Sequence, residues 1–392
     1  MTSEWKTSPL RDLVGFISKG IAPSYADEES ETTVRVLNQK CNRNFRITYS
    51  ESRLHDLSRK KVPTERFVRI DDILINSTGA GTAGRIAQIC NLPCDTIVDG
   101  HMIIIRANNK VSQKYLGYAM KAHQWEVLQL DEGSTGQTEL NRERLLDEIM
   151  ISYPTSFALQ EMIVKTLEGI DRKLLINEKV NDNLQQQAAA LFANFYDQAE
   201  TEVGFTEMIQ ILGGGTPKTG ESSYWNGDIP FFTPKDVGFP YTLTTEKTIT
   251  EEGLAHCNSR LYPINTVFVT ARGTVGKVGL PGVPMAMNQS CYALVGKDTH
   301  QLLVYFYTLK AVDRLKYKAS GAVFDAITTR DFEAENIMKL SDDDTKAFLD
   351  VAEPIYQAVL NNSIENLRLS ELRDSLLPKL MNGEIDVTDI RL

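Results

Sequence analysis

The sequence LLINEKVNDNL, residues 174–184, decides the fold of this chain. It lies within residues 157–196, which contain no proline and in which apolar residues recur at alternating steps of four and three. This heptad spacing predicts one long helix with a single apolar seam. Asn177 and Asn181 occupy two successive positions of that seam. Asparagine in a seam lowers stability but fixes the register in which a partner helix packs.

A second copy of this pattern, VLNNSIENLRL, fills residues 359–369. Its asparagines, Asn362 and Asn366, follow Asn177 and Asn181 by the same interval. Chance rarely places two polar breaks at the same steps of two apolar seams. We therefore expect the two helices to pair with each other, antiparallel, through these four asparagines. Prolines favour helix ends, so Pro354 and Pro378 limit the predicted second helix to residues 354–377.

The segments before the two helices repeat as well. Residues 19–23 (KGIAP) correspond to 213–217 (GGGTP), residues 72–75 to 266–269, and residues 134–136 to 319–321. Short β-branched runs punctuated by Gly and Pro are typical of strand-rich globular domains. We predict an α+β fold with an internal pseudo-two-fold repeat, in which two long antiparallel helices separate two strand-rich α/β domains. The boundaries are 1–155 (first domain), 156–200 (central helix), 201–341 (second domain) and 342–392 (C-terminal helix).

Composition excludes several classes of protein. The 392 residues carry a net charge of −10, which excludes a uniformly basic nucleic-acid coat. Five scattered cysteines exclude a disulfide framework and argue against a metal site. No stretch reaches the roughly 18 uninterrupted apolar residues of a membrane span. Because the N-terminus also lacks the apolar core of a signal peptide, we expect a cytoplasmic protein without a membrane partner.

Charge is distributed unevenly along the chain. Residues 35–69 contain ten basic and three acidic residues, whereas residues 331–392 contain six basic and fourteen acidic ones. This separation indicates two different kinds of partner.

One motif resembles an enzyme site. The run from Gly79 to Gly84 matches G-x-G-x-x-G, and Asp99 follows at the spacing of a ribose-binding acid. A dinucleotide site needs a long helix that begins at the last glycine, but residues 91–93 (NLP) end the segment too early. A β-hairpin loop explains the glycines better, because the second half keeps Gly273 and Gly276 at the same place. We predict no catalytic residue, since the chain has no H-E-x-x-H, G-x-S-x-G or N-P-P-Y motif.

The remaining polar pattern is typical of nucleic-acid contacts. Arg, Asn and Gln read base edges through paired hydrogen bonds, whereas Lys mostly holds phosphates. The predicted DNA-binding residues are Gln39, Lys40, Arg43, Arg46, Lys60, Lys61, Thr78 and Arg85 in the first half, and Thr233, Lys235, Arg272, Lys277 and Asn288 in the second.

Three further elements carry a resemblance to a known family. They are GGTP at residues 214–217, IPFFT at 229–233 and LRDSLLPKLMNGEI at 372–385. With INE at 176–178 and the duplicated plan, they make the whole chain resemble the specificity subunit of type I restriction–modification enzymes.

The resemblance implies two target-recognition domains, each reading one half of a bipartite target in double-stranded DNA. It implies two helices that act as a spacer and dock two methyltransferase subunits, with restriction motor subunits as further partners. The chain itself would not be an enzyme, and S-adenosylmethionine, ATP and Mg would be cofactors of the partners. A heptad inserted after Gln187 is expected to widen the spacer. The residues alone leave two alternatives open: a nucleotide-dependent enzyme that uses Gly79 to Gly84, and a coiled-coil scaffold that binds no DNA.

Overall fold

The computed structural model describes residues 4–132, 138–238, 240–318 and 326–387. The chain divides into two compact units, unit 1 (Met1–Arg172 and Ser370–Leu392) and unit 2 (Lys173–Leu369). The long helices α4 (Phe157–Gln198) and α9 (Asp342–Met381) each contribute to both units. Each unit thus combines a strand-rich domain with segments of both helices. The predicted repeat of residues 134–136 in 319–321 lies outside the described residues.

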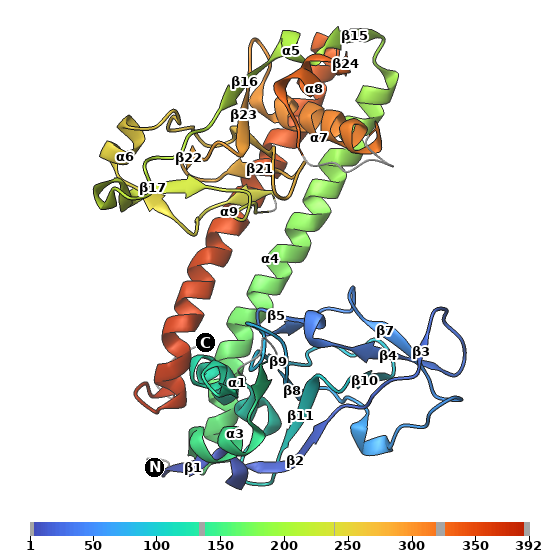
Figure 1. Cartoon of the computed structure of the whole chain (residues 1–392), viewed down its shortest axis with the longest axis vertical. Coiled ribbons are helices and arrows are strands. Elements are labelled where there is room, and N and C mark those ends of the chain that lie inside the picture. Colours follow the sequence, from blue (N-terminus) through green and yellow to red (C-terminus); the bar gives the residue numbers. More distant parts are fainter. Residues whose placement is uncertain (1–3, 133–137, 239, 319–325, 388–392) are drawn as a thin grey trace. The chain divides into compact units, whose positions relative to one another are not determined.

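Unit 1 contains two four-stranded sheets (Figure 1). The first is antiparallel in the order β2 (Val14–Lys19), β11 (Met102–Ala107), β8 (Ile73–Asn76) and β9 (Ile86–Gln88). The second has the order β10 (Thr96–Val98), β4 (Thr33–Leu37), β7 (Arg53–Asp56) and β3 (Tyr25–Ala26). Helices α1 (Gln113–Ala122), α2 (Gln124–Leu128) and α3 (Arg142–Glu148) follow, and β1 (Trp5–Pro9) pairs with β14 (Met150–Pro154) beside α4. Short strands β12 (Asp131–Glu132) and β13 (Glu139–Leu140) form a hairpin.

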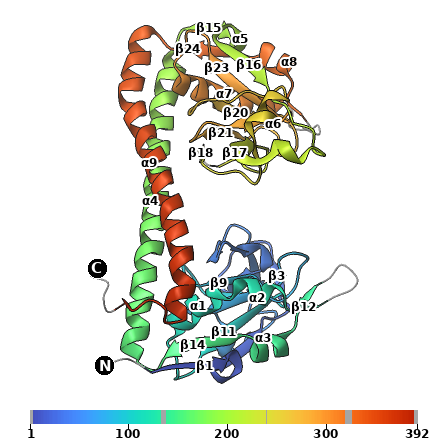
Figure 2. The same ribbon diagram turned by 90° about the vertical axis from the view of Figure 1, so that its left-hand side faces the viewer.

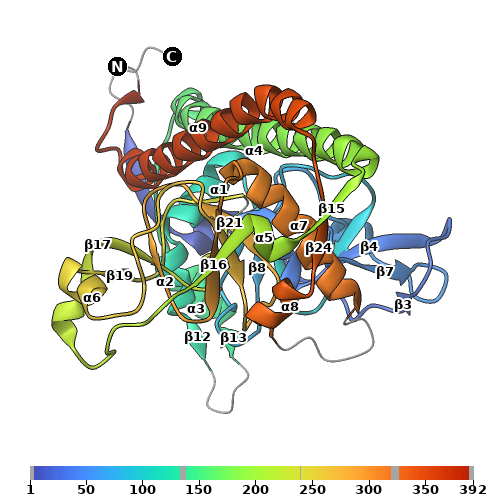
Figure 3. The same ribbon diagram turned by 90° about the horizontal axis from the view of Figure 1, so that it is seen from above.

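Unit 2 repeats this plan. Its larger sheet has the order β16 (Ile209–Gly213), β23 (Cys291–Gly296), β20 (Val267–Thr270), β21 (Val278–Pro281) and β18 (Tyr241–Thr242). The smaller one is β19 (Thr248–Ile249), β17 (Trp225–Phe232) and β22 (Ala286–Met287). The helices are α5 (Phe205–Met208), α6 (Glu251–Ala255), α7 (Gln301–Lys318) and α8 (Thr329–Glu333), and β15 (Thr201–Gly204) pairs with β24 (Asn336–Lys339). Helix α7 packs across β20, β21 and β23 (Figure 3).

The repeat extends to single hydrogen bonds. Gln113 and Gln301 begin α1 and α7, and each ties its helix to the preceding strand. In both, Oε1 accepts from a backbone N–H at the strand end and Nε2 donates to a strand carbonyl. The duplication inferred from short sequence fragments is therefore a duplication of the fold.

The glycine turn of the second half has a close counterpart in the first. A Cβ atom on Gly214 would lie 2.1 Å from the carbonyl oxygen of Asn288, and one on Gly20 would lie 2.1 Å from that of Asp99. Both positions are therefore restricted to glycine by backbone approach. Although KGIAP contains only one glycine, it forms the same close contact as GGGTP.

We expect Gly214→Ala to destabilise unit 2 by about 1–3 kcal/mol, because the new methyl group overlaps backbone atoms that have no room to move. Gly213→Ala is the matched control, since a Cβ at Gly213 meets nothing within 4 Å. Thermal unfolding followed by circular dichroism measures both. Equal melting temperatures for the two variants would contradict the close contact.

The helix seams follow the predicted heptads. In α4, Ile163, Leu167 and Leu174 are buried, as are Phe348 and Val359 in α9. In unit 1 the seam of α4 joins a core that also contains Leu377 and Leu380 of α9. In unit 2 the opposite end of α4 packs with the beginning of α9. The two helices thus run antiparallel side by side within each unit (Figures 1 and 2).

The four seam asparagines form two hydrogen-bonded pairs inside unit 2. Asn177 Nδ2 donates to Asn366 Oδ1, and Asn362 Nδ2 donates to Asn181 Oδ1, each at 2.8 Å. Asn177 Nδ2 also reaches Glu365 Oε2 at 2.8 Å. As an antiparallel repeat requires, the first asparagine of each helix is bonded to the second asparagine of the other helix. Satisfied buried amides of this kind fix one register.

The prediction that prolines bound the second helix was wrong. Helix α9 is continuous from Asp342 to Met381 and contains both Pro354 and Pro378. An interior proline removes one helix hydrogen bond and costs about 3 kcal/mol. Apolar residues on both sides of Pro354, Phe348 and Val359 among them, are buried in the core of unit 2 and keep the helix in one piece. Pro378 lies in the last turn, between the buried residues Leu377 and Leu380. Among the described residues no helix is long and apolar enough to cross a membrane.

Candidate nucleic-acid interface

In unit 1, three loops meet at one end of the sheet β2-β11-β8-β9. They are the helical turn Gln39–Cys41, the β8–β9 loop and the turn between β10 and β11. Thr78 Oγ1 lies 2.7 Å from His101 Nδ1 and donates to Gln39 Oε1 at 3.4 Å. We call Gln39, Lys40, Thr78 and His101 the unit 1 tip. It presents amide, hydroxyl, imidazole and ammonium groups, the groups that contact bases and phosphates.

The unit 2 tip, Thr233, Lys235, Arg272 and Asn288, occupies the corresponding end of the second domain. Arg272 corresponds to Thr78, because each forms an isolated bridge to the segment before the last domain helix. The Asn288 N–H donates to the carbonyl oxygen of Phe232 at 3.0 Å, in the same way that the Asp99 N–H bonds to that of Leu37. Residues far apart in the sequence are thus brought together in both units.

Glycine gives both tip loops their shape. Gly79, Gly84, Gly273 and Gly276 have φ values of 115°, 85°, 85° and 74°, a region that side chains disfavour. The corresponding glycines of each loop therefore share one backbone geometry, while the residues between them differ in number and type.

This geometry does not favour the nucleotide-binding alternative at residues 79–84. Strand β8 pairs antiparallel with β9, with Ile75 opposite Ile86, so the run from Gly79 to Gly84 closes a hairpin and is followed by a strand. No helix begins at Gly84 to face a pyrophosphate. Asp99 is 4% exposed and accepts from the His101 N–H at 2.9 Å. Burial raises the pKa of its carboxyl group.

The other predicted cations of unit 1 have different surroundings. Lys40, Arg43 and Lys61 are exposed, and Arg46 is half-buried. Lys60 Nζ donates to the carbonyl oxygen of Ala22 at 2.7 Å, so Lys60 holds the turn that contains Gly20. Arg85 borders the β8–β9 loop and donates to the carbonyl oxygen of Gly81 at 3.2 Å.

In unit 2 the predicted cations lie around the tip loop. Lys277 is exposed next to Gly276, and Lys235 lies 3.8 Å from Glu246 with 80% of its side chain exposed. Thr233 Oγ1 donates to Asp236 Oδ2 at 2.6 Å, so its hydroxyl group already has a partner within its own turn. Arg272 is exposed.

Sequence reasoning missed three residues of this surface. His101 is not among the predicted DNA-binding residues, but its ring lies at the unit 1 tip against Thr78. Lys19 and Glu139 form an ion pair beside it, joining β2 to β13. The repeat contained a signal for His101, because Ser290 occupies the corresponding position in the second half. The Ser77 N–H donates to the carbonyl oxygen of His101, and the Ala271 N–H donates to that of Ser290 in the same way.

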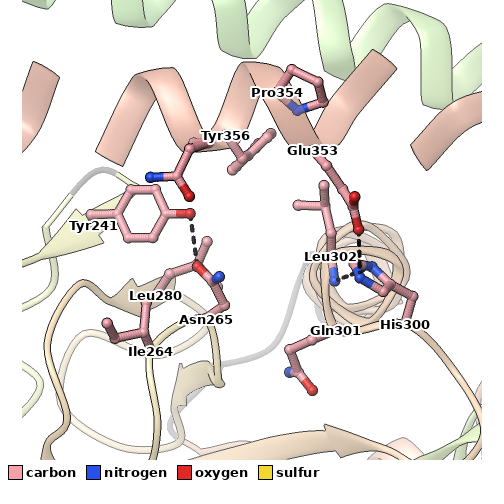
Figure 4. A pocket seen from close by; sticks show the side chains of 11 residues that line it. Tyr241, Ile264, Asn265, Leu280, His300, Gln301, Leu302, Glu353, Pro354 and Tyr356 are labelled. Atoms are coloured by element: carbon pink, nitrogen blue, oxygen red, sulfur yellow. Dashed lines mark hydrogen bonds and ion pairs between the residues drawn. The ribbon is translucent and has the colours of Figure 1, made fainter. Parts of the chain in front are cut away.

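A cavity of about 510 Å³ in unit 2 has a different role (Figure 4). His300 Nε2 and Glu353 Oε1 lie 2.7 Å apart on one side of it, and Tyr241 Oη donates to Asn265 Oδ1 at 2.8 Å on the other. It lies at the first turn of α7, whereas Lys316 of the last turns of α7 lies against Gly276. The cavity therefore lies at the end of α7 that is farthest from the unit 2 tip. It forms part of the contact between α9 and the strand-rich domain of unit 2.

No group of three or more His, Cys, Asp or Glu side chains in the described parts of the chain is placed to hold a metal ion. The tips carry hydrogen-bonding and cationic groups on exposed loops, an arrangement suited to contacting a large polar surface.

Comparisons with known proteins agree with this geometry. Residues 2–186 and 201–339 match the type I restriction modification DNA specificity domain. The chain is 28% identical over 185 residues to the type I restriction enzyme HindI specificity subunit of Haemophilus influenzae, covering 46% of this chain and 40% of that one. It is 32% identical over 124 residues to the MjaIX specificity subunit of Methanocaldococcus jannaschii, covering 30% and 29%. These alignments span less than half the length of either relative.

A solved structure shares the fold over nearly the whole chain. The S subunit of a type I restriction–modification system from M. genitalium has a TM-score of 0.59 and 13% identity, and the match covers 97% of this chain and 96% of that one.

Proposed function

The chain belongs to the type I restriction modification DNA specificity family, and from this premise we propose that it is the DNA-specificity subunit of such a system. Each target-recognition domain reads one half of a bipartite target in double-stranded DNA, the first through the unit 1 tip and the second through the unit 2 tip. The observation that carries the proposal is the repeat of one loop framework with different exposed side chains. Thr78 and His101 in unit 1 stand where Arg272 and Ser290 stand in unit 2.

We propose that the long helices dock two methyltransferase subunits. Leu175, Ile176 and Val180 of α4 are each at least 40% exposed, on a helix whose opposite side is occupied by α9. Large apolar side chains that remain exposed together mark protein interaction sites. The acidic residues of α9 suit a partner with basic groups.

The chemistry of the complex belongs to the partners in this proposal, and the chain itself is not an enzyme. A methyltransferase subunit supplies S-adenosylmethionine, and a restriction subunit supplies ATP- and Mg-dependent cleavage in the cytoplasm. This chain contributes sequence reading and assembly.

Mapping methylated adenines in a host that carries this chain with its methyltransferase tests the proposal. We expect one motif made of two specific parts separated by a gap of fixed length. A single uninterrupted motif, or methylation that does not depend on this chain, would contradict it. A coiled-coil scaffold without DNA binding predicts the second of these results.

DNA binding is expected to be salt-dependent through the predicted phosphate contacts. Lys61→Ala should make the slope of log K against log salt concentration shallower by about 1 for specific and non-specific DNA alike. Lys61 is preferred to Lys60, because Lys60 also holds the Ala22 turn. Lys110→Ala is the control, since Lys110 is exposed beyond the end of β11 that lies farthest from the tip. An unchanged slope for Lys61→Ala would remove this segment from the interface.

A further inference from the structure

A strained hairpin stands beside the unit 1 tip. Strands β5 (Asn42–Arg43) and β6 (Arg46–Ile47) are joined by a two-residue turn in which Asn44 and Phe45 have φ values of 52° and 60°. Two positive φ values define a turn that favours Asn-Gly. Phenylalanine is unfavourable at the second position, because a bulky side chain resists the left-handed region. The Phe45 ring lies 4.9 Å from Lys121 Nζ, and Phe45 forms a bridge with Ala87 of β9, which holds the turn in place.

The hairpin forms one wall of a groove of about 450 Å³ within unit 1. The hairpin groove, as we call it, is lined by Arg43, Asn44, Phe45, Arg85, Gln124 and Leu128. Its volume is in the range of sites that hold small organic ligands, and it exceeds what a single phosphate group fills.

The polar groups of the groove divide into structural and unpartnered ones. Gln124 accepts from the Ile86 N–H and donates to the carbonyl oxygen of Gly84, both at 2.8 Å, so both ends of its amide are bonded to the backbone near β9. Neither Arg43 nor Asn44 has a side-chain hydrogen bond or ion pair to any described residue. Arg85 has one, to Gly81. Two guanidinium groups and one amide therefore face the groove with donors to spare.

An exposed tryptophan follows directly after Gln124, which lines the groove. Trp125 follows Gln124 in α2 and precedes Leu128 by three residues, the spacing of neighbours on a helix surface. Its side chain is 74% exposed, more than any other large apolar residue described in unit 1. The indole ring is thus within reach of the groove and is available for stacking.

We propose that the hairpin groove holds one nucleotide of the bound DNA with its base outside the stack. The indole of Trp125 stacks on the base, the Asn44 amide bonds to the base edge, and Arg43 and Arg85 pair with the flanking phosphates. Stacking on aromatic rings with cations along the backbone is how proteins hold unstacked nucleotides. The inference rests on the proposed function, since it requires DNA at the unit 1 tip.

The second domain lacks part of this chemistry. Counted from Lys40 and Lys235, the positions of Arg43 and Asn44 are taken by Gly238 and Phe239, residue types with neither a cation nor an amide in the side chain. The unstacked nucleotide is therefore expected in one half of the target only.

The test uses the full chain with its methyltransferase and duplexes of the methylated motif, in which 2-aminopurine replaces each base in turn. The methyltransferase is expected to extrude its own target adenines, so the methylated positions are set aside. At the remaining positions, we expect a strong rise in fluorescence on binding at one position of one half-site. Trp125→Ala should abolish the rise and weaken binding about ten-fold, whereas Trp125→Phe should keep it. Arg43→Ala should weaken binding, and Lys110→Ala, which removes a charge beyond the end of β11 that lies farthest from the tip, should not.

Normal DNA binding in which no position other than the methylated ones brightens would overturn the inference and leave the proposed function standing. A rise at that other position that persists in Trp125→Ala would also overturn it, because the base would then be unstacked elsewhere. Absence of DNA binding by the unaltered complex would reject the proposed function itself. Circular dichroism melting of Trp125→Ala identifies any loss of folding.

Discussion

Asp171→Ala is expected to destabilise unit 1 by about 3 kcal/mol, because Asp171 joins α4 to both α1 and α9. Its carboxylate accepts from Tyr118 Oη at 2.8 Å and from Arg373 Nη1 at 3.1 Å, and it lies 3.7 Å from Lys121 Nζ. The Lys121 and Arg373 side chains are only 11% and 15% exposed. Without Asp171, the largely buried Lys121 would lose its counterion, whereas Arg373 would keep the Asp374 carboxylate at 2.8 Å.

The loss of stability in Asp171→Ala should become smaller as the pH rises. Burial already lowers the pKa of Lys121 below its ordinary value of 10.5, against the pull of Asp171. Removing the carboxylate lowers this pKa further, so the folded variant sheds the Lys121 proton at a lower pH than the unfolded chain does. Stability should therefore rise as pH increases toward 10.5, and part of the defect should be recovered. Arg373 stays charged throughout, so recovery is incomplete.

Thermal unfolding at pH 7 and near pH 10 measures this effect, with an expected shift of roughly 10 °C at the lower pH. Glu161→Ala, which removes an exposed carboxylate from the same helix, is the control and should leave the transition in place. A similar small effect of both substitutions would show that the cations near Asp171 are adequately solvated. It would contradict the role of Asp171 in holding α4 to α1 and α9.

A matched pair of heptad insertions is expected to change the gap of the DNA target without changing its halves. The unit boundary falls after Arg172 in α4 and after Leu369 in α9. Seven residues inserted at both places keep the seam in phase and lengthen each helix by about 10 Å. At 3.4 Å per base step this equals about three base pairs. We expect the methylated motif to gain a wider gap.

In the structure, the unit boundary is a better place for the insertion than the position after Gln187 that the sequence suggested. Gln187 lies within unit 2, between Asn181 and the buried Ala188, so lengthening α4 there would separate the asparagine pairs from the core of unit 2. Insertion in α4 alone is the control, and it should abolish methylation, because α9 is then too short to follow. Methylated-base mapping decides the matter. An unchanged gap, or altered half-sites, in the double insertion would contradict the role of the helices as a spacer.

The long helices could be predicted from the sequence because their determinants are local. Heptad spacing and the position of four asparagines required no knowledge of the rest of the chain, and the pairing of Asn177 with Asn366 follows from the repeat. The continuity of α9 through Pro354 could not be predicted in the same way. The cost of the proline is offset by burial against unit 2, and that burial depends on contacts between distant segments.

The loops of the interface were only partly predictable. Polar and cationic residue types indicated the tips, and the glycines indicated the hairpins. The neighbours of each side chain depend on strand register, however, which brings Thr78 to His101 and ties Lys60 to the turn of Ala22. Composition alone cannot tell a cation that holds a turn from one that is free. The same limit hid Trp125, whose exposure distinguishes it from the other tryptophans only in the folded chain.

The central claim is that each strand-rich domain reads one half of the target independently of the other. The paired strands β1 and β14 close the first domain beside α4, and β15 and β24 close the second in the same way. A chain in which residues 5–154 are replaced by a second copy of residues 201–339 should therefore keep its framework. Mapping the adenines that this chain directs for methylation is the decisive measurement. Our account predicts a motif with two identical half-sites, inverted because the helices run antiparallel, and each equal to one half of the original motif. A motif that keeps two different halves would contradict it.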